Sequence, residues 1–274
     1  MEILNSFSPT RVKAVLFDFD GTISTLRCGW EEVMAPIMVE KLLSCGREIM
    51  EECTRLVNAY IDESTGIQTI FQMKWLSEQV ALRGGPKIDP WDYKAEYNDK
   101  LMQRIEQKKQ ALQQGLESAD RYLMCGAIDF LKLLKKEGIH TYVASGTDHP
   151  DMVTEAKALG VYDYFDELMG APVHEENCSK EAVLKKLIEK NRLIGDDIAV
   201  VGDGKVEIRL GKQAGARTLG LASDERARRG VNSTKRARLI NAGADIICGD
   251  FTETNELKRF LGLGQEAQNA VQRT

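Results

Sequence analysis

Two acidic residues, Asp18 and Asp20, follow the largely apolar run Val12–Leu16 in the segment Leu-Phe-Asp-Phe-Asp-Gly-Thr. Gly21 is expected to end the strand just after them, because glycine adopts turn conformations at little steric cost. Both acids would then lie near the carboxyl end of a buried strand, where open α/β sheets bind ligands. Such a pair offers a nucleophile or metal ligand beside a general acid/base, which suits phosphoryl transfer. Taken alone, the same residues could equally form an ordinary Asp-Gly turn.

Two further segments could bind an anion. Ser145, Gly146 and Thr147 directly follow a predicted strand, His140–Ala144, and a hydroxyl with consecutive backbone N–H groups can cradle a phosphate. Lys180 begins a predicted helix and could neutralise that phosphate. A plain Ser-Gly turn and a solvated lysine are the structural alternatives.

A second pair of acids, Asp203 and Glu207, follows the predicted strand Asp197–Gly202 in Gly-Asp-Gly-Lys-Val-Glu. Together with Asp18 they could supply a site for a hard cation such as Mg²⁺. The alternative is a helix N-cap aspartate followed by a glutamate in the first turn.

The elements that would position these residues alternate between strand and helix over residues 121–262. The predicted helices are Gly126–Glu137, Asp151–Leu159, Lys180–Lys190 and Ile208–Ala214, and the predicted strands are His140–Ala144, Glu167–Met169, Asp197–Gly202, Ala216–Leu221 and Ala244–Cys248. This alternation predicts an α/β fold with a Rossmann-like, doubly wound parallel sheet, which the first strand, Val12–Asp18, must rejoin.

Residues 25–118 show almost no strand pattern. The helices predicted there are Glu31–Leu43, Arg47–Ile61, Thr69–Leu82 and a long polar helix over Tyr93–Gln114. We therefore expect an all-α helical cap domain over 25–118, inserted after the first strand of a core formed by 10–24 and 119–264. Residues 265–274 are expected to form a polar tail.

The composition argues against several classes of partner. The 274 residues carry a formal net charge of −5, which gives no support for nucleic-acid or membrane-surface binding. No apolar run approaches the length of a membrane span, and the first residues lack the pattern of a signal peptide. Six cysteines without a CxxC pair indicate reduced thiols, so we expect a cytoplasmic protein. The sequence does not distinguish a monomer from a homodimer.

A basic cluster lies near the end of the chain. It contains Arg226, Arg228, Arg229, Lys235, Arg236 and Arg238. A solvated loop and helix face is the favoured interpretation, and an anion-binding or partner patch is the alternative.

The order and spacing of Asp-Phe-Asp-Gly-Thr, Ser-Gly-Thr, Lys180 and Gly-Asp-Gly-x-x-Glu resemble the four motifs of the haloacid dehalogenase-like (HAD) hydrolase superfamily. The resemblance covers the whole predicted core. The helical insert lies between the first and second motifs, where that family's type 1 caps are found.

The resemblance implies a role for each matching residue. Asp18 would be the nucleophile that forms an aspartyl-phosphate, and Asp20 would protonate the leaving alcohol and then activate water. Ser145, Gly146 and Lys180 would bind the phosphoryl group.

Mg²⁺ is the cofactor that the resemblance implies. It would bind the Asp18 carboxylate, the Asp20 backbone carbonyl and Asp203. Glu207 would support the site, although many family members have aspartate at its position.

The resemblance implies a phosphatase acting on a small phosphorylated metabolite, because family members that act on other bonds usually lack an acid at the position of Asp20. Similarity over 143–170 to domains of sugar metabolism points to a sugar or polyol phosphate. A phosphomutase is the alternative enzyme, and a catalytically silent binding module is the alternative of another class. Arg27, Thr65 and Gly66 are the candidate substrate-specificity residues.

Overall fold

A computed structural model describes residues 1–6, 10–46, 49–175, 180–191 and 193–263; the predicted polar tail lies outside these ranges. Within them the chain forms a seven-stranded sheet in the order β1-β7-β6-β5-β2-β3-β4. The strands are β1 (Glu2–Ile3), β2 (Ala14–Phe17), β3 (His140–Asp148), β4 (Glu167–Ala171), β5 (Ile198–Gly202), β6 (Arg217–Leu221) and β7 (Ile246–Cys248). All neighbouring pairs are parallel except β1 with β7.

Helices cover both faces of the sheet and also form the insert. They are α1 (Glu31–Leu43), α2 (Met50–Ser64), α3 (Thr69–Leu82), α4 (Pro90–Gln113), α5 (Ala127–Lys136), α6 (His149–Ala158), α7 (Lys180–Asn191), α8 (Lys205–Gln213), α9 (Ser233–Asn241) and α10 (Thr254–Phe260).

Alternating residues of β2 show how the two faces are filled. Val15 and Phe17 belong to the apolar cluster that includes residues of α5, α6 and α10. Ala14 and Leu16 point to the other face, where they pack with residues of α7. Successive side chains of a strand point to opposite faces, so burial of all four requires helices on both sides. This confirms the predicted doubly wound α/β core.

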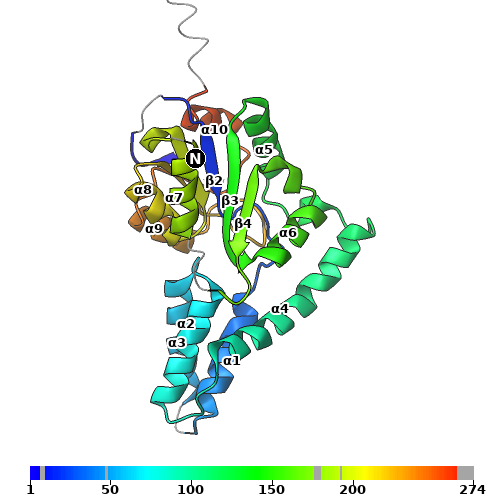
Figure 1. Cartoon of the computed structure of the whole chain (residues 1–274), viewed down its shortest axis with the longest axis vertical. Helices are drawn as coiled ribbons and strands as arrows, with labels where there is room; N and C mark the ends of the chain where they lie inside the picture. Colours follow the sequence, from blue (N-terminus) through cyan, green and yellow to red (C-terminus); the bar gives the residue numbers. More distant parts are fainter. Residues whose placement is uncertain (7–9, 47–48, 176–179, 192, 264–274) are drawn as a thin grey trace, which may run out of the picture.

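The helices α1–α4 form an insert between β2 and β3 that projects away from the sheet, and α4 leads back to it (Figure 1). The insert has its own apolar cluster, which includes Met34, Met38, Val57, Met73 and Tyr97. The methionine and aromatic side chains of this segment therefore mainly pack the insert.

Three local features differ from the sequence-based expectation. β3 continues to Asp148 with a register irregularity after Ala144, so Ser145, Gly146 and Thr147 lie within the strand and not after it. The short edge strand β1 pairs antiparallel with β7 and was not predicted. No helix bounds were predicted for α9 or α10, because their short lengths and many charged residues give weak helical periodicity.

Candidate active site

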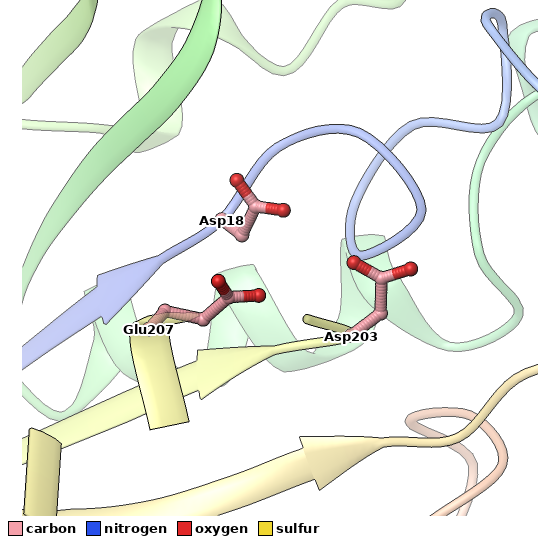
Figure 2. A group of neighbouring side chains, drawn as sticks. All are labelled: Asp18, Asp203 and Glu207. Carbon is pink, nitrogen blue, oxygen red and sulfur yellow. The ribbon is translucent and has the colours of Figure 1, made fainter. Parts of the chain in front are cut away.

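The structure brings three of the predicted acids together at the carboxyl end of the central strands. Asp18 follows β2, and its N–H donates to the Val201 carbonyl of β5 at 2.9 Å. Asp203 follows β5, and Glu207 lies in the first turn of α8. All three are buried, and one carboxylate oxygen from each lies within 4.8 Å of the others. Figure 2 shows the three side chains around a common space.

Two glycines allow these acids to approach. Gly21 has φ +74°, and a Cβ at that position would lie 2.4 Å from Asp203 Oδ2. A Cβ at Gly202 would lie 2.3 Å from Glu207 Cγ. The glycines of both acidic motifs therefore leave room for the carboxylates, and Gly21 also adopts a backbone conformation that other residues rarely take.

Lys180 links two of the acids. Its Nζ donates to Asp18 Oδ1 at 2.8 Å and to Glu207 Oε2 at 3.1 Å. The other oxygen of Glu207, Oε1, accepts from the backbone N–H of Gly204 at 2.6 Å. Asp18 Oδ2 makes no hydrogen bond to any residue that the structure describes. One oxygen of Asp18 is thus oriented by a cation while the other is available.

Burial and the neighbouring charges together shift the pKa values of Asp18 and Lys180. Burial raises the pKa of Asp18 well above its ordinary value; Lys180 opposes the shift, and the acids Glu207 and Asp203 add to it. Burial lowers the pKa of Lys180, but Asp18 and Glu207 outweigh it and the net pKa is raised. Lys180 therefore stays positively charged, and the ionised form of Asp18 depends on that charge and on any further cation nearby.

Asp20 lies beside the predicted phosphate-binding residues. Its Oδ2 accepts from the hydroxyl of Thr147 at 2.7 Å and from that of Ser145 at 3.3 Å. Its Oδ1 is buried, makes no hydrogen bond and lies 3.9 Å from Arg27 Nε. No role was predicted for Thr147 itself, although the Ser-Gly-Thr motif placed its hydroxyl near the site.

Arg27 lines the site, and its guanidinium is paired with a buried acid. Its guanidinium donates to both oxygens of Glu155 on α6, at 2.7 to 3.2 Å, and Glu155 is completely buried. This geometry ties the segment between β2 and α1 to the core. It supports a positioning role for Arg27, and the direct substrate contact expected from the sequence stays a prediction.

The sequence named Lys235 only as part of the basic cluster, and it did not place Lys235 or Glu225 beside the acidic residues. Lys235 Nζ donates to Asp203 Oδ2 at 2.6 Å and also to Glu225. The available signal was Asn232, whose side chain accepts from the Lys235 N–H at 3.0 Å and caps α9. Recognising this cap would have placed Lys235 in a helix.

The turn between α2 and α3 reaches the core. A Cβ at Gly66 would lie 3.5 Å from Glu207 Oε2, and a Cβ at Gly146 would lie 2.9 Å from the Ile67 carbonyl oxygen. Gly66 has φ +92°, which favours glycine there. The predicted specificity turn is therefore placed directly over the predicted phosphate-binding strand.

Core and insert together enclose a cavity of about 310 Å³. The predicted site residues on its wall are Asp18, Asp20, Arg27, Thr65, Gly66, Ser145, Gly146, Lys180 and Asp203. Glu207 lies directly behind them and contacts Lys180. Wall residues not predicted include Trp30, Glu31, Asn58, Asp62, Gln72, Tyr97, Glu225, Lys235 and Arg238. The hydroxyl of Thr65 donates to the Ile61 carbonyl at 2.9 Å.

The interpretation of the basic cluster as a solvated face holds for part of it only. Lys235 and Arg238 line the cavity. Arg226 pairs with Glu32 of the insert, and Arg236 pairs with Glu2 of β1. The cluster is divided among several carboxylates because the fold brings acids from distant segments to it.

Among the described residues, no helix is long and apolar enough to span a membrane.

Acids, a fixed lysine and hydroxyl groups thus converge at one end of a parallel sheet under a helical cover. This arrangement can hold a phosphate and a divalent cation beside a carboxylate with a free oxygen.

Comparisons with known proteins agree with this geometry. A family model described as haloacid dehalogenase-like hydrolase matches residues 12–215. A predicted phosphatase from Clostridium acetobutylicum is similar in structure, with a TM-score of 0.60 and 18% identity over 90% of this chain and 98% of that one. A predicted phosphoglycolate phosphatase from Haemophilus somnus 129pt has a TM-score of 0.58 and 16% identity over 91% and 99% of the two chains.

A β-phosphoglucomutase from Clostridium difficile is also similar, with a TM-score of 0.60 and 13% identity over 95% of this chain and 99% of that one. A search of curated protein sequences gives no match. These structural likenesses show the fold, and the family model covers most of the chain. The chain belongs to the haloacid dehalogenase-like hydrolase family, and its cap helices are inserted between β2 and β3 of the core.

Proposed function

We propose that this protein is a Mg²⁺-dependent phosphatase that hydrolyses a small phosphorylated metabolite through an aspartyl-phosphate on Asp18. The observation that carries the proposal is the Asp18 carboxylate, which has Oδ1 fixed by Lys180 and Oδ2 free at the wall of a cavity that Asp20 also lines. A nucleophile, a cation and a second acid in one buried site are what phosphomonoester hydrolysis requires.

The donor set fits Mg²⁺. The carboxylates of Asp18 and Asp203, together with the backbone carbonyl of Asp20, would hold the ion, because hard cations prefer oxygen ligands. Both oxygens of Glu207 already accept hydrogen bonds, so we assign it a supporting role. When bound, Mg²⁺ supplies positive charge that reduces the repulsion between the Asp18 carboxylate and a phosphate dianion.

The chain's own groups would act in two steps. Asp18 Oδ2 attacks phosphorus, and the bond to the alcohol oxygen breaks as Asp20 gives that oxygen a proton. Asp20 then takes a proton from a water molecule, whose oxygen attacks phosphorus and releases phosphate from Asp18. Ser145, the backbone of Gly146 and Lys180 would hold the phosphoryl oxygens throughout.

The cavity supports a small substrate with a hydroxyl-rich organic part. Its volume of about 310 Å³ is that of a small-ligand site. The wall contributed by the insert offers Asn58, Gln72 and the ring of Trp30, which suit hydrogen bonding and packing of a sugar or polyol. A sugar or polyol phosphate is therefore the organic class that we propose.

Replacement of the nucleophile provides the direct test. Asp18→Asn keeps the side-chain volume but removes the attacking oxygen, so hydrolysis of p-nitrophenyl phosphate should fall at least about a thousandfold. The matched control is Asp129→Asn on α5, away from the cavity, which should retain the wild-type rate. Wild-type activity in purified, folded Asp18→Asn would refute the proposal.

The metal requirement is tested separately. Hydrolysis should stop after exhaustive chelation, return with Mg²⁺ and be inhibited by Ca²⁺. The larger Ca²⁺ relaxes the tight octahedral geometry of Mg²⁺, and it could bind both oxygens of Asp18 and remove the free one. Calorimetric titration of the apoprotein with Mg²⁺ gives a second readout, and undiminished hydrolysis without metal would exclude this site as a cofactor site.

A further inference from the structure

Four cations line the cavity within the described part of the chain, and three of them are held by well-buried acids. Lys180 binds Asp18 and Glu207, and Arg27 binds the fully buried Glu155. The third, Lys235, binds Asp203 and Glu225, whose side chains are 9% and 17% exposed. These three cations have their charge matched inside the protein.

Arg238 is the exception. Its Nη1 donates to Asp62 Oδ1 at 3.0 Å, and the Asp62 side chain is 65% exposed whereas that of Arg238 is 15% exposed. Its Nε is buried and makes no hydrogen bond. Among the described residues, Asp62 is the only hydrogen-bond partner of this guanidinium. A guanidinium has five N–H donors, so most of the capacity of Arg238 is unused.

Helix α9 places Arg238 on the substrate side of the site. Arg238 follows Lys235 by three residues, and residues three apart lie on the same face of a helix. Lys235 reaches Asp203, so Arg238 lies about one helical turn further from the acidic cluster, on the wall that faces α2 of the insert. A substrate with its phosphoryl group on Asp18 would extend its organic part toward this wall.

We infer that Arg238 receives a second acidic group on the organic part of the substrate, so that the enzyme prefers phosphomonoesters carrying a further carboxylate or phosphoryl group. The inference rests on the proposed phosphatase function, and it further specifies that the leaving group carries a negative charge. The planar fork of arginine matches two oxygens of such a group. Displacing Asp62 costs little, because ion pairs with exposed carboxylates contribute little to stability.

Matched substrates test the preference. Sorbitol 6-phosphate and 6-phosphogluconate differ only in carrying an alcohol or a carboxylate at carbon 1, and fructose 6-phosphate and fructose 1,6-bisphosphate test a second phosphoryl group. We expect the wild-type kcat/KM to be at least about tenfold higher for the acidic member of one pair, and that pair identifies which acid is bound. Equal values within both pairs would overturn the inference.

Variants of the ion pair separate binding from structure. Arg238→Gln should lower the ratio of kcat/KM for the acidic over the neutral substrate by about ten- to hundredfold, and Arg238→Lys should lower it less. Asp62→Asn removes the competing carboxylate and should raise the same ratio. Arg236→Gln, which breaks an ion pair outside the cavity, is the control and should leave the ratio unchanged. A purely structural bridge predicts that both partners' variants change the two substrates in parallel, which would refute the inference.

Binding measurements keep this test independent of the proposed chemistry. In the Asp18→Asn variant, calorimetry should show tighter binding of 6-phosphogluconate than of sorbitol 6-phosphate, or of the bisphosphate than of the monophosphate. Absence of p-nitrophenyl phosphate hydrolysis in the wild type would refute the proposed function. Equal binding within both pairs would refute the role of Arg238 alone.

Discussion

At the scale of single residues, the two oxygens of Asp20 have different surroundings. Oδ2 is held by the hydroxyls of Thr147 and Ser145, whereas Oδ1 is buried without a hydrogen bond, 3.9 Å from Arg27. A buried acceptor without a partner is unfavourable, and a donor on the substrate would satisfy it. This geometry suits a carboxyl group that exchanges a proton with a substrate oxygen.

The proton-transfer role that we propose for Asp20 leads to a leaving-group prediction. Asp20→Asn should slow hydrolysis of an alkyl phosphate by about a hundred- to ten-thousandfold and that of p-nitrophenyl phosphate much less. An alkoxide needs the proton, whereas nitrophenolate leaves without it. Steady-state kinetics with both substrates checks this, and an equal loss for the two would assign Asp20 a metal-site or structural role instead.

At the scale of elements, the turn between α2 and α3 rests on β3. Strand β3 carries Ser145 and Gly146, and the Ile67 carbonyl of the turn lies so close that a side chain at Gly146 would meet it at 2.9 Å. The absence of a side chain at this position therefore sets how closely the insert approaches the proposed phosphate site.

Gly146→Ala should push the turn between α2 and α3 away from β3. The added methyl group must displace the turn by a few tenths of an ångström, and we expect kcat/KM for a metabolite to fall by about tenfold, since such small misplacements reduce rates strongly. The melting temperature should change little, because the turn can move outward. Kinetics and thermal melting check the two parts of this prediction.

Gly138→Ala is the control, because we expect it to lower stability without lowering activity. Gly138 follows α5 with φ +66°, and a methyl group added there would meet no atom within 4 Å, so alanine adds backbone strain without contact. It should lower the free energy of unfolding by about 1 kcal/mol and leave activity intact. If Gly146→Ala instead lost stability and kept its activity, the contact would serve folding and not the site.

At the scale of the whole molecule, the insert and the core have separate apolar clusters, and several ion pairs join them. Lys94 of α4 pairs with Asp148 at the end of β3, and Arg238 of α9 pairs with Asp62 of α2. Separate cores with polar contacts between them are typical of domains that move relative to each other.

Removal of the insert should therefore spare the core but change its selectivity. Replacing residues 31–113 with a short Gly/Ser linker should leave a folded core that hydrolyses p-nitrophenyl phosphate, although slowly, because the site is open to water. Its preference among phosphorylated metabolites should disappear, and large phosphorylated molecules should become accessible. Circular dichroism establishes folding first, and a folded core that kept the wild-type preference would show that the insert does not select the substrate.

The sequence by itself determined the fold class and most of the elements. The apolar strands, the alternation over 121–262 and the absence of strand patterns in the insert are local properties, and local periodicity reports them directly. Most of the residues expected at the site also came from local motifs near strand ends or helix starts, whereas Arg27, Thr65 and Gly66 did not. Asp18, Asp203 and Glu207 lie close together because parallel strands bring their carboxyl ends to one edge of the sheet.

Only the tertiary structure decided how the remaining charges are matched. The sequence grouped Lys235 and Arg238 with neighbouring cations, whereas the fold assigns Lys235 to Asp203 and Glu225 and Arg238 to Asp62 of the insert. The fold likewise pairs Arg27 with Glu155, which lies far from it in the sequence. Ion pairs form between side chains that are close in space, and their strength depends on burial. A linear pattern contains neither quantity, so only the folded structure shows which acid each of these cations pairs with.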